Sequence, residues 1–256
     1  MIRKLSWILT ILILACNSHK DDEDASNGGM AYTIIKKYPH DTAAFTQGLE
    51  FYKGNLYEGT GEYGESQLRE LDLSTGKVVR KVDLNKKYFG EGITFFKDKI
   101  YQLTWENHTV FRYDTNFKLI DTIPLPTEGW GMTHDNQNLI ISDGSSKLYF
   151  RNPETMAEVR SINVSENGSL VNNLNELEYI HGFIYANIWQ TDYIVKIDPS
   201  NGNVVGKADF TNLLKHQGEV VYDSNDVLNG IAYDSTSNKT YITGKNWPAL
   251  FEVDFK

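Results

Sequence analysis

The apolar and polar positions of this chain follow a repeated pattern of short β-strands. A phrase made of a polar or aromatic residue, usually a glycine, and then an apolar or β-branched run occurs five times. The first residues of successive phrases are 44, 39, 45 and 54 positions apart, a period typical of one β-propeller blade. The pattern predicts five blades. Their leading residues are Gln47, Glu91, Trp130, Asn175 and Asn229.

A second regularity follows each phrase. A β-rich run ends 14 residues after the leading residue in four repeats and 16 residues after it in the fifth. Such a constant length predicts a strand, a turn and an antiparallel return strand. The return strands end at Gly61, Trp105, Gly144, Trp189 and Lys245. With the further β-rich runs, the blades are expected at residues 47–84, 91–125, 130–164, 175–210 and 229–255.

The fifth blade has one β-rich run too few. The run from Ala31 to Tyr38 precedes the first blade and has no partner in it. If it pairs with residues 249–255, it covers a sheet edge that would otherwise be open to aggregation. We therefore expect an all-β fold over residues 31–256, a five-bladed β-propeller. Its ring is expected to be closed by an N-terminal strand that completes the last blade.

The first 30 residues have a different composition. Arg3 and Lys4 precede an apolar stretch that is too short to span a bilayer but has the length of a signal-peptide core. The letters ILAC, ending at Cys16, resemble the lipobox of bacterial lipoproteins, in which the cysteine is acylated. Residues 1–16 are predicted to be a lipoprotein signal peptide, and the polar, acidic residues 17–30 a disordered tether.

A lipid on Cys16 would anchor the protein to a membrane. The expected location is the cell envelope of a Gram-negative bacterium, either periplasmic or on the surface of the outer membrane. The segment from Lys20 to Glu23 resembles a signal that sends some bacterial lipoproteins to the surface, but it is equally typical of a solvated linker. Cys16 is the only cysteine, so a catalytic thiol is not expected.

The charge excludes one class of partner. The formal net charge is −9, whereas domains that bind a phosphate backbone are usually basic. We expect no nucleic-acid partner, and we expect the protein to be a monomer.

The repeats also predict where a site would lie. The innermost strands of a propeller run the same way along the central channel, so equivalent residues lie at one height. The leading residues and the return-strand ends should therefore meet at one channel mouth, where large aromatic side chains would surround a single carboxylate. Such partly dry pockets are typical ligand sites. The candidates are Gln47, Glu91, Trp105, Trp130, Asn175, Trp189, Asn229 and Lys245. A structural interpretation stays open for each, since polar channel residues often hold water and tryptophans often pack between blades.

Eight ordered motifs resemble the glutamine cyclotransferases, the plant and bacterial type of glutaminyl-peptide cyclotransferase. They are FTQGLEF (45–51), FGEGITF (89–95), LTW (103–105), GWGMT (129–133), LNELEYI (174–180), ANIWQTDYIVKIDP (186–199), LNGIAYD (228–234) and TGKNWP (243–248). The resemblance covers about residues 33–255. It implies a five-bladed propeller that converts the N-terminal glutamine of peptides or proteins to pyroglutamate and releases ammonia.

The resemblance also implies roles by position. Glu91 matches the catalytic glutamate, which would carry a proton from the substrate α-amine to the leaving ammonia. The implied substrate-binding residues are Phe45, Gln47, Trp105, Trp130, Asn175, Trp189 and Lys245. The resemblance does not mark Asn229, which is a candidate only because it is the leading residue of the fifth repeat.

No metal ion or other cofactor is expected. The six histidines are scattered, and the chain has neither an HExxH motif nor paired cysteines. Two alternatives remain. One is a non-catalytic propeller that binds peptides or proteins. The other is a metal-dependent lactone hydrolase, which would need several acidic groups where the leading ring has only Glu91.

Overall fold

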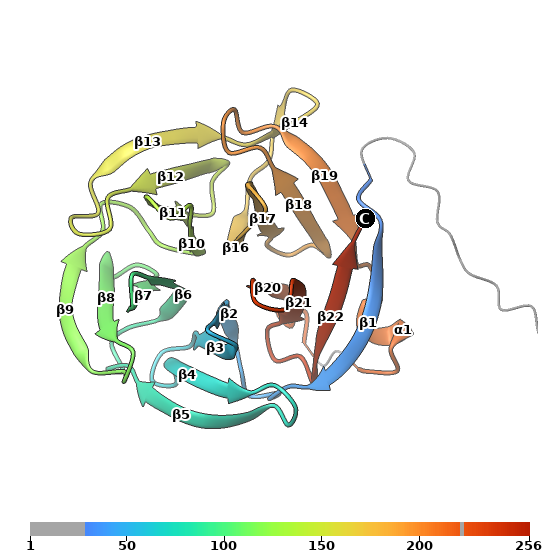
Figure 1. The fold of residues 1–256 in the computed structure, drawn as a ribbon, viewed down its shortest axis with the longest axis horizontal. Coiled ribbons are helices and arrows are strands. Elements are labelled where there is room, and N and C mark those ends of the chain that lie inside the picture. The colour runs from blue at the N-terminus through green and yellow to red at the C-terminus, as the bar shows by residue number, and fades with distance from the viewer. Residues whose placement is uncertain (1–28, 221–222) are drawn as a thin grey trace, which may run out of the picture.

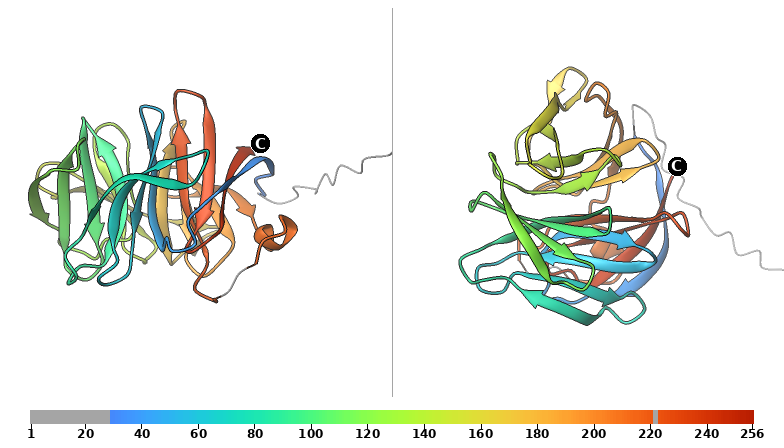
Figure 2. Two further views of the ribbon diagram at one scale, coloured as in Figure 1. Left: turned by 90° about the horizontal axis from the view of Figure 1, so that it is seen from below. Right: turned by 60° about the vertical axis from the view of Figure 1, so that its left-hand side comes forward.

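The computed structural model describes residues 29–220 and 223–256, and these form a ring of sheets around a central axis (Figure 1). Five four-stranded sheets make up the ring, and every strand pair within them is antiparallel. The predicted five-bladed β-propeller is therefore confirmed. Viewed from the side, the blades form a disc (Figure 2).

The first four blades each use four consecutive strands, ordered from the axis outwards. Blade one contains β2 (Thr46–Tyr52), β3 (Asn55–Thr60), β4 (Gln67–Asp72) and β5 (Lys77–Asp83). Blade two contains β6 (Gly90–Phe96), β7 (Lys99–Thr104), β8 (Thr109–Asp114) and β9 (Leu119–Pro124). Blade three contains β10 (Met132–His134), β11 (Leu139–Ser142), β12 (Lys147–Arg151) and β13 (Glu158–Asn163). Blade four contains β16 (Leu174–Ile180), β17 (Phe183–Ile188), β18 (Tyr193–Ile197) and β19 (Val204–Asp209).

The fifth blade combines strands from both ends of the described chain. Its strands are β20 (Leu228–Asp234), β21 (Lys239–Gly244), β22 (Ala249–Phe255) and β1 (Tyr32–Pro39), from the axis outwards. β1 lies antiparallel to β22, with Tyr32 opposite Phe255 and Pro39 opposite Ala249 (Figure 1). The outer edge of β22 is covered by this pairing.

The N-terminal segments fall largely outside the described residues. The predicted signal peptide with Cys16, and the tether up to residue 28, are not described. The predicted end of the tether at residue 30 is wrong. The Met30 amide donates a hydrogen bond to the Lys207 carbonyl oxygen at 2.8 Å. The Met30 side chain is buried, because it packs into the apolar cluster next to blade four. Among the described residues no helix is long and apolar enough to cross a membrane.

Two small elements interrupt the strand pattern. A hairpin of β14 (Ser165–Glu166) and β15 (Ser169–Leu170) follows blade three. A one-turn helix, α1 (Leu213–His216), lies at the rim next to blade five (Figures 1 and 2). Its two leucines are buried in the cluster between blades four and five, which explains why a helical turn occurs in this connection.

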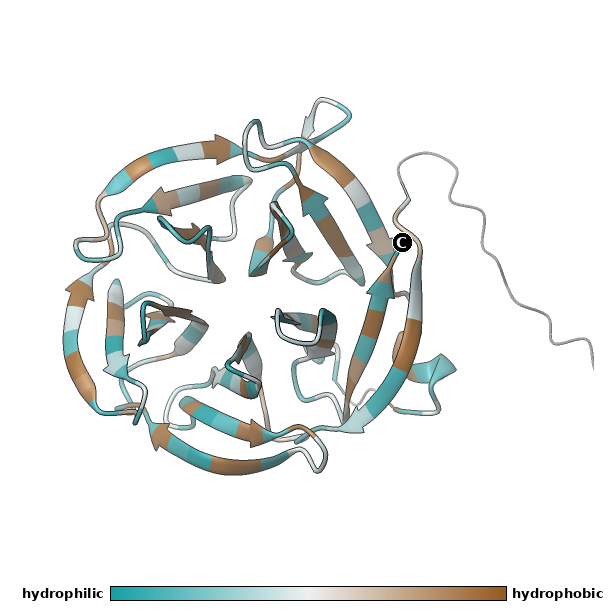
Figure 3. Ribbon diagram, in the orientation of Figure 1, coloured by the Kyte–Doolittle hydropathy of each residue, from teal (hydrophilic) through white to brown (hydrophobic). Residues whose placement is uncertain are grey.

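The hydrophobic core is divided among the spaces between blades. One cluster of buried apolar residues lies at each junction of neighbouring blades. Between blades one and two, for example, Tyr57 and Leu68 pack with Ile93 and Phe95. The outer strands alternate between hydrophobic and hydrophilic residues (Figure 3). Each blade is therefore stabilised by its neighbours, which makes ring closure important.

Glycines bring the inner strands into contact at the axis. A Cβ on Gly48 would lie 2.5 Å from the Ile93 amide nitrogen, and one on Gly131 would lie 1.9 Å from the Asn175 carbonyl oxygen. Blade four has Glu176 at this position instead. Its carboxylate accepts the amides of Leu49 and Ile231 at 3.1 and 2.8 Å and so connects the inner strands of blades one and five. At this level the Glu176 side chain takes the place that glycine leaves open in the other blades.

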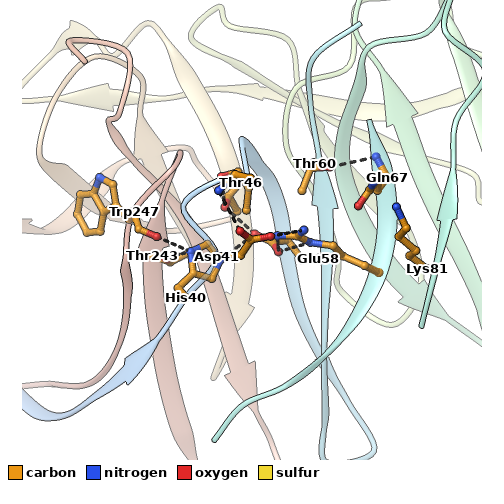
Figure 4. Close-up of polar contacts among 12 residues, drawn as sticks. His40, Asp41, Thr46, Glu58, Thr60, Gln67, Lys81, Thr243 and Trp247 are labelled. Atoms are coloured by element: carbon orange, nitrogen blue, oxygen red, sulfur yellow. Dashed lines mark hydrogen bonds and ion pairs between the residues drawn. The ribbon is translucent and has the colours of Figure 1, made fainter. Parts of the chain in front are cut away.

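A buried polar network joins the end of β1 to blades one and five (Figure 4). His40 contacts the Trp247 carbonyl oxygen through Nδ1 at 2.8 Å and Glu58 through Nε2 at 3.0 Å. Arg69 donates to Glu58 from Nε at 2.8 Å and forms an ion pair with Asp41 at 3.0 Å. The network therefore connects the end of the closing strand to blade five, which that strand completes, and to blade one, which follows it in the chain.

Two members of this network, Glu58 and His40, stabilise each other's charged form. Burial alone would raise the pKa of Glu58, but the charges of His40 and Arg69 outweigh it and lower the pKa to about 2. Burial would lower the pKa of His40, but Glu58 raises it above its usual value. The carboxylate thus stays ionised although it is fully buried.

Replacing Glu58 should make the protein less stable and change the pH dependence of its stability. The folded pKa of Glu58 is about 2 against an ordinary 4.5, so its contribution is full above pH 4.5 and is lost as the pH falls towards 2. We expect Glu58→Gln to cost about 3 kcal/mol at pH 7 and to flatten the loss of stability between pH 5 and pH 2. Urea unfolding at several pH values measures both.

Glu70→Gln is the matched control, because Glu70 pairs with Arg80 in the same blade but remains 15% exposed, with Arg80 36% exposed. It should cost roughly 1 kcal/mol or less. Equal costs for the two variants, or an unchanged acid limb in Glu58→Gln, would contradict this account.

Removal of the closing strand should destabilise the whole ring. Deleting residues 31–38 uncovers β22 and removes buried Tyr38, so we expect a large drop in the thermal midpoint and aggregation of the expressed protein. Thermal unfolding followed by circular dichroism measures this. A truncated protein as stable as the full one would show that β1 is dispensable.

Candidate active site

The leading residues of the repeats lie in irregular strand segments at one end of the channel. In four blades the pairing of the inner two strands shifts register next to the leading residue. The shifts lie between Thr46 and Gly48, Gly90 and Ile93, Leu174 and Leu177, and Leu228 and Ile231. In blade three the strand begins only at Met132, so Trp130 precedes it. β-Bulges re-aim side chains, and they are common beside active sites.

A cavity of about 160 Å³ lies where these segments meet. It brings together the candidate catalytic residue Glu91 and all seven residues that the resemblance marks as substrate-binding. The residues that line it are Phe45, Gln47, Phe89, Glu91, Trp105, Trp130, Asn175, Trp189, Asn225 and Lys245. A wider hollow of about 730 Å³ adjoins this cavity and shares Phe45 and Asn225 with it.

Glu91 is a buried carboxyl group without a hydrogen-bond partner among the described residues. It is 4% exposed. Burial raises its pKa well above the usual 4.5, the charge of Lys245 opposes this rise, and the charge of Glu128 adds to it. A carboxyl group with a raised pKa can both accept and donate a proton near neutral pH.

Lys245 brings one cation to the same cavity. Burial lowers its pKa from 10.5 to about 8, although the charges of Glu91 and Glu62 act against this decrease. Its Nζ lies 4.6 Å from the centre of the Phe45 ring, and no ion pair within 4.0 Å involves it in the described part of the chain. The ammonium group is therefore available to a ligand.

Aromatic rings form the walls. The Trp130 and Trp189 rings meet edge to face with centres 5.5 Å apart, and Phe89 meets Trp105 in the same way at 5.7 Å. Gly144 leaves room for this packing, since a Cβ there would lie 2.6 Å from the Trp130 ring. The glycine also has a φ of +79°, which disfavours any other residue.

Two amide side chains supply polar contacts. Gln47 Oε1 accepts a hydrogen bond from Asn229 Nδ2 at 3.2 Å, which leaves the Gln47 NH₂ group as its free end. Asn175 Oδ1 is buried and has no hydrogen-bond partner among the residues that the structure describes. Both amides line the cavity, so both can bind a polar group of a ligand.

Asn229 does not line the cavity. It is fully buried behind Gln47, and its Nδ2 also donates to the Thr46 carbonyl oxygen at 2.9 Å. The repeat pattern predicted that Asn229 lies at the channel mouth with the other leading residues, and this prediction is wrong. The bulge in blade five directs its side chain towards blade one, where it orients the Gln47 amide.

The chain matches the family model described as "Glutamine cyclotransferase" over residues 7–255. It belongs to the glutamine cyclotransferase family. A relative in Arabidopsis thaliana named "Glutaminyl-peptide cyclotransferase" is 40% identical over 228 residues, which cover 87% of this chain and 71% of the relative. The solved structure of a Myxococcus xanthus glutaminyl cyclase matches with a TM-score of 0.83 and 37% identity, covering 90% of this chain and 99% of that one.

Two cavity residues of this glutamine cyclotransferase were missed by the sequence analysis. Phe89 stands two residues before Glu91, as Phe45 stands two residues before Gln47, so the repeat itself held a signal for Phe89. Asn225 lies in the connection before β20, outside the repeated phrases, and no periodic signal could have found it.

The described residues contain no group of three or more His, Cys, Asp or Glu side chains that could hold a metal ion. The polar chemistry of the cavity in this family member is supplied by one carboxyl group, one ammonium group and the side-chain amides.

Proposed function

We propose that this chain is a glutaminyl-peptide cyclotransferase. It converts the N-terminal glutamine of a peptide or protein to pyroglutamate and releases ammonia. Family membership and the names of the Arabidopsis and Myxococcus relatives support the reaction. The observation that carries the mechanism is the buried Glu91, which has no hydrogen-bond partner in the described part of the chain and lies in a small aromatic cavity.

The size and lining of the cavity suit one terminal residue. Its volume of about 160 Å³ is below the several hundred Å³ of pockets for drug-sized ligands. The rings of Trp105, Trp130 and Trp189 would pack the methylene stem of the glutamine. The peptide that follows the glutamine would leave through the adjoining hollow.

The reaction joins two groups of the same residue. The α-amino nitrogen attacks the side-chain amide carbon, a C–N bond forms, and the tetrahedral intermediate loses the amide nitrogen as ammonia. Because nucleophile and electrophile belong to one residue, the enzyme gains rate by holding a rotamer in which they are close. The indole walls would restrict the glutamine to such a rotamer.

Glu91 would move the proton between the two nitrogens. A peptide α-amine has a pKa of about 7.7, so it is partly protonated near neutral pH and must lose a proton during attack. Glu91 takes this proton and donates it to the departing amide nitrogen. The raised pKa of Glu91 suits both steps, since an ordinary carboxyl group would donate poorly at neutral pH.

Aimed donors would stabilise the negative charge on the amide oxygen of the intermediate. The free NH₂ group of Gln47, the Asn175 amide and the Lys245 ammonium all line the cavity. Preorganised donors of this kind can contribute several kcal/mol to the rate because they need no reorganisation during reaction.

A lipid anchor on Cys16 remains part of the proposal. Its support is the basic start of the chain, the apolar stretch after it and the lipobox-like ILAC sequence. In this arrangement the enzyme works at the cell envelope, on peptides or proteins outside the cytoplasm.

Glu91→Gln should abolish turnover and leave the fold intact. The substitution keeps the size of the side chain but removes the group that carries the proton, so we expect kcat to fall by about 10²–10⁴. Ammonia release from a Gln-initiated dipeptide measures turnover, and thermal unfolding checks the fold.

The control is Glu106→Gln, which changes an exposed carboxylate next to Trp105. It should leave turnover unchanged. Near-normal activity of Glu91→Gln would remove Glu91 from the mechanism, and no ammonia from the wild-type protein would favour a peptide-binding propeller.

Lys245 should produce an alkaline limb in the pH profile of kcat. Its pKa is about 8, so it is charged below this pH and loses its charge above it, together with its effect on the oxyanion. Lys245→Arg keeps the charge, because arginine does not deprotonate in proteins, and should abolish the limb. Lys245→Met should lower kcat below pH 8, towards the level that the wild-type enzyme reaches above this pH. Profiles from pH 6 to 10 test this, and an unchanged limb in Lys245→Arg would exclude Lys245 as its source.

A further inference from the structure

One carboxylate outside the cavity holds two of its walls. Glu128 lies in the connection between β9 and β10, two residues before Trp130. Its Oε2 accepts the indole N–H of Trp105 at 3.1 Å and that of Trp130 at 3.1 Å. These two indoles belong to blades two and three, so Glu128 links side chains from neighbouring blades.

The third tryptophan of the cavity is held differently. Trp189 meets the Trp130 ring edge to face at 5.5 Å, and no described residue accepts a hydrogen bond from its indole N–H. An indole has a single donor, so the bond to Glu128 fixes the rotation of Trp105 and Trp130, whereas Trp189 lacks this constraint.

Glu128 itself does not line the cavity, whereas Trp105 and Trp130 do. It is half-buried, and no ion pair joins it to a basic group among the described residues. A carboxylate that only accepts hydrogen bonds from two cavity walls can influence a ligand through them without touching it.

We propose that Glu128 is a positioning residue that holds Trp105 and Trp130 in the orientation that binds the substrate glutamine. This rests on the proposed function, because the bound residue is the glutamine of that reaction. The two indoles pack against the substrate both before and during cyclisation, so Glu128 contributes mainly to binding, and its loss should appear in KM.

Glu128 also acts on the catalytic carboxyl group through its charge. The negative charge of Glu128 raises the pKa of Glu91, in the same direction as burial. Protonation of Glu91 at low pH removes the group that accepts the proton, so the profile of kcat should have an acid limb. Removing the charge of Glu128 lowers the pKa of Glu91, so this acid limb should move to lower pH. Glu128→Gln tests this effect by itself, because it removes the charge and keeps the size of the side chain.

Two variants separate the hydrogen bonds from the charge. Glu128→Ala removes both and should raise KM for a Gln-initiated dipeptide about tenfold, with a smaller change in kcat. Glu128→Gln keeps an oxygen that accepts the indole N–H groups, so its KM should stay within about threefold of wild type. The acid limb should move to lower pH in both variants. Glu106→Ala, an exposed neighbour of Trp105, should change none of these quantities.

An unchanged KM in Glu128→Ala would overturn the proposal. So would a KM in Glu128→Gln as high as in Glu128→Ala, since the retained oxygen would then have no effect. A shift of the acid limb in Glu106→Ala as large as in Glu128→Gln would overturn the electrostatic part.

The indole N–H signals in ¹⁵N NMR spectra give a readout independent of catalysis. In Glu128→Ala the signals of Trp105 and Trp130 should shift and exchange faster with solvent, while that of Trp189 should stay close to its wild-type position. Unchanged Trp105 and Trp130 signals would refute the tether even in an active enzyme. If the Trp105 and Trp130 signals shift in Glu128→Ala but the wild-type protein releases no ammonia, the proposed function is refuted and the positioning role of Glu128 stands.

Discussion

The contact between inner strands at the propeller axis is the constraint on which the rest of the structure depends. Gly48 and Gly131 have no room for a side chain because the backbone of the next blade lies against them. Glu176 fills the corresponding place in blade four and bonds the amides of two other inner strands. With the strands held this closely, Gln47, Glu91, Trp130 and Asn175, the residues just before this ring in four of the blades, line one small cavity at the channel mouth.

Two buried glutamates show how strongly the surroundings decide the chemistry of one residue type. Glu58 is surrounded by His40, Arg69 and a hydroxyl group, so its pKa is lowered to about 2 and it remains a structural anion. Glu91 has aromatic neighbours and only a partial counter-charge from Lys245, so its pKa is raised. The first environment stabilises the closure of the ring, and the second gives a carboxyl group suited to the proton transfer that we propose.

The polar network that closes the ring and the cavity contain residues that are adjacent in sequence, although their roles differ. Thr46 bonds Glu58 of the closure network at 2.6 Å, and the next residue, Gln47, lines the cavity. Asn229 of blade five completes the connection, since it bonds both Thr46 and Gln47. Strain or disorder at the junction of blades five and one would therefore reach the cavity directly, which links stability to the proposed activity.

The sequence by itself determined the number of blades, their order and most of the cavity, because a repeat of fixed length places equivalent residues at equal heights. Glu91, Gln47 and the three tryptophans followed from that periodicity. Only the tertiary structure decided what lies outside the repeat or depends on local bulges: Asn229 turning behind Gln47, Asn225 entering from a loop, and Glu128 joining two indoles. The physical reason is that periodicity fixes the position of a residue along the axis, whereas the direction of its side chain depends on strand irregularities and neighbours from distant parts of the chain.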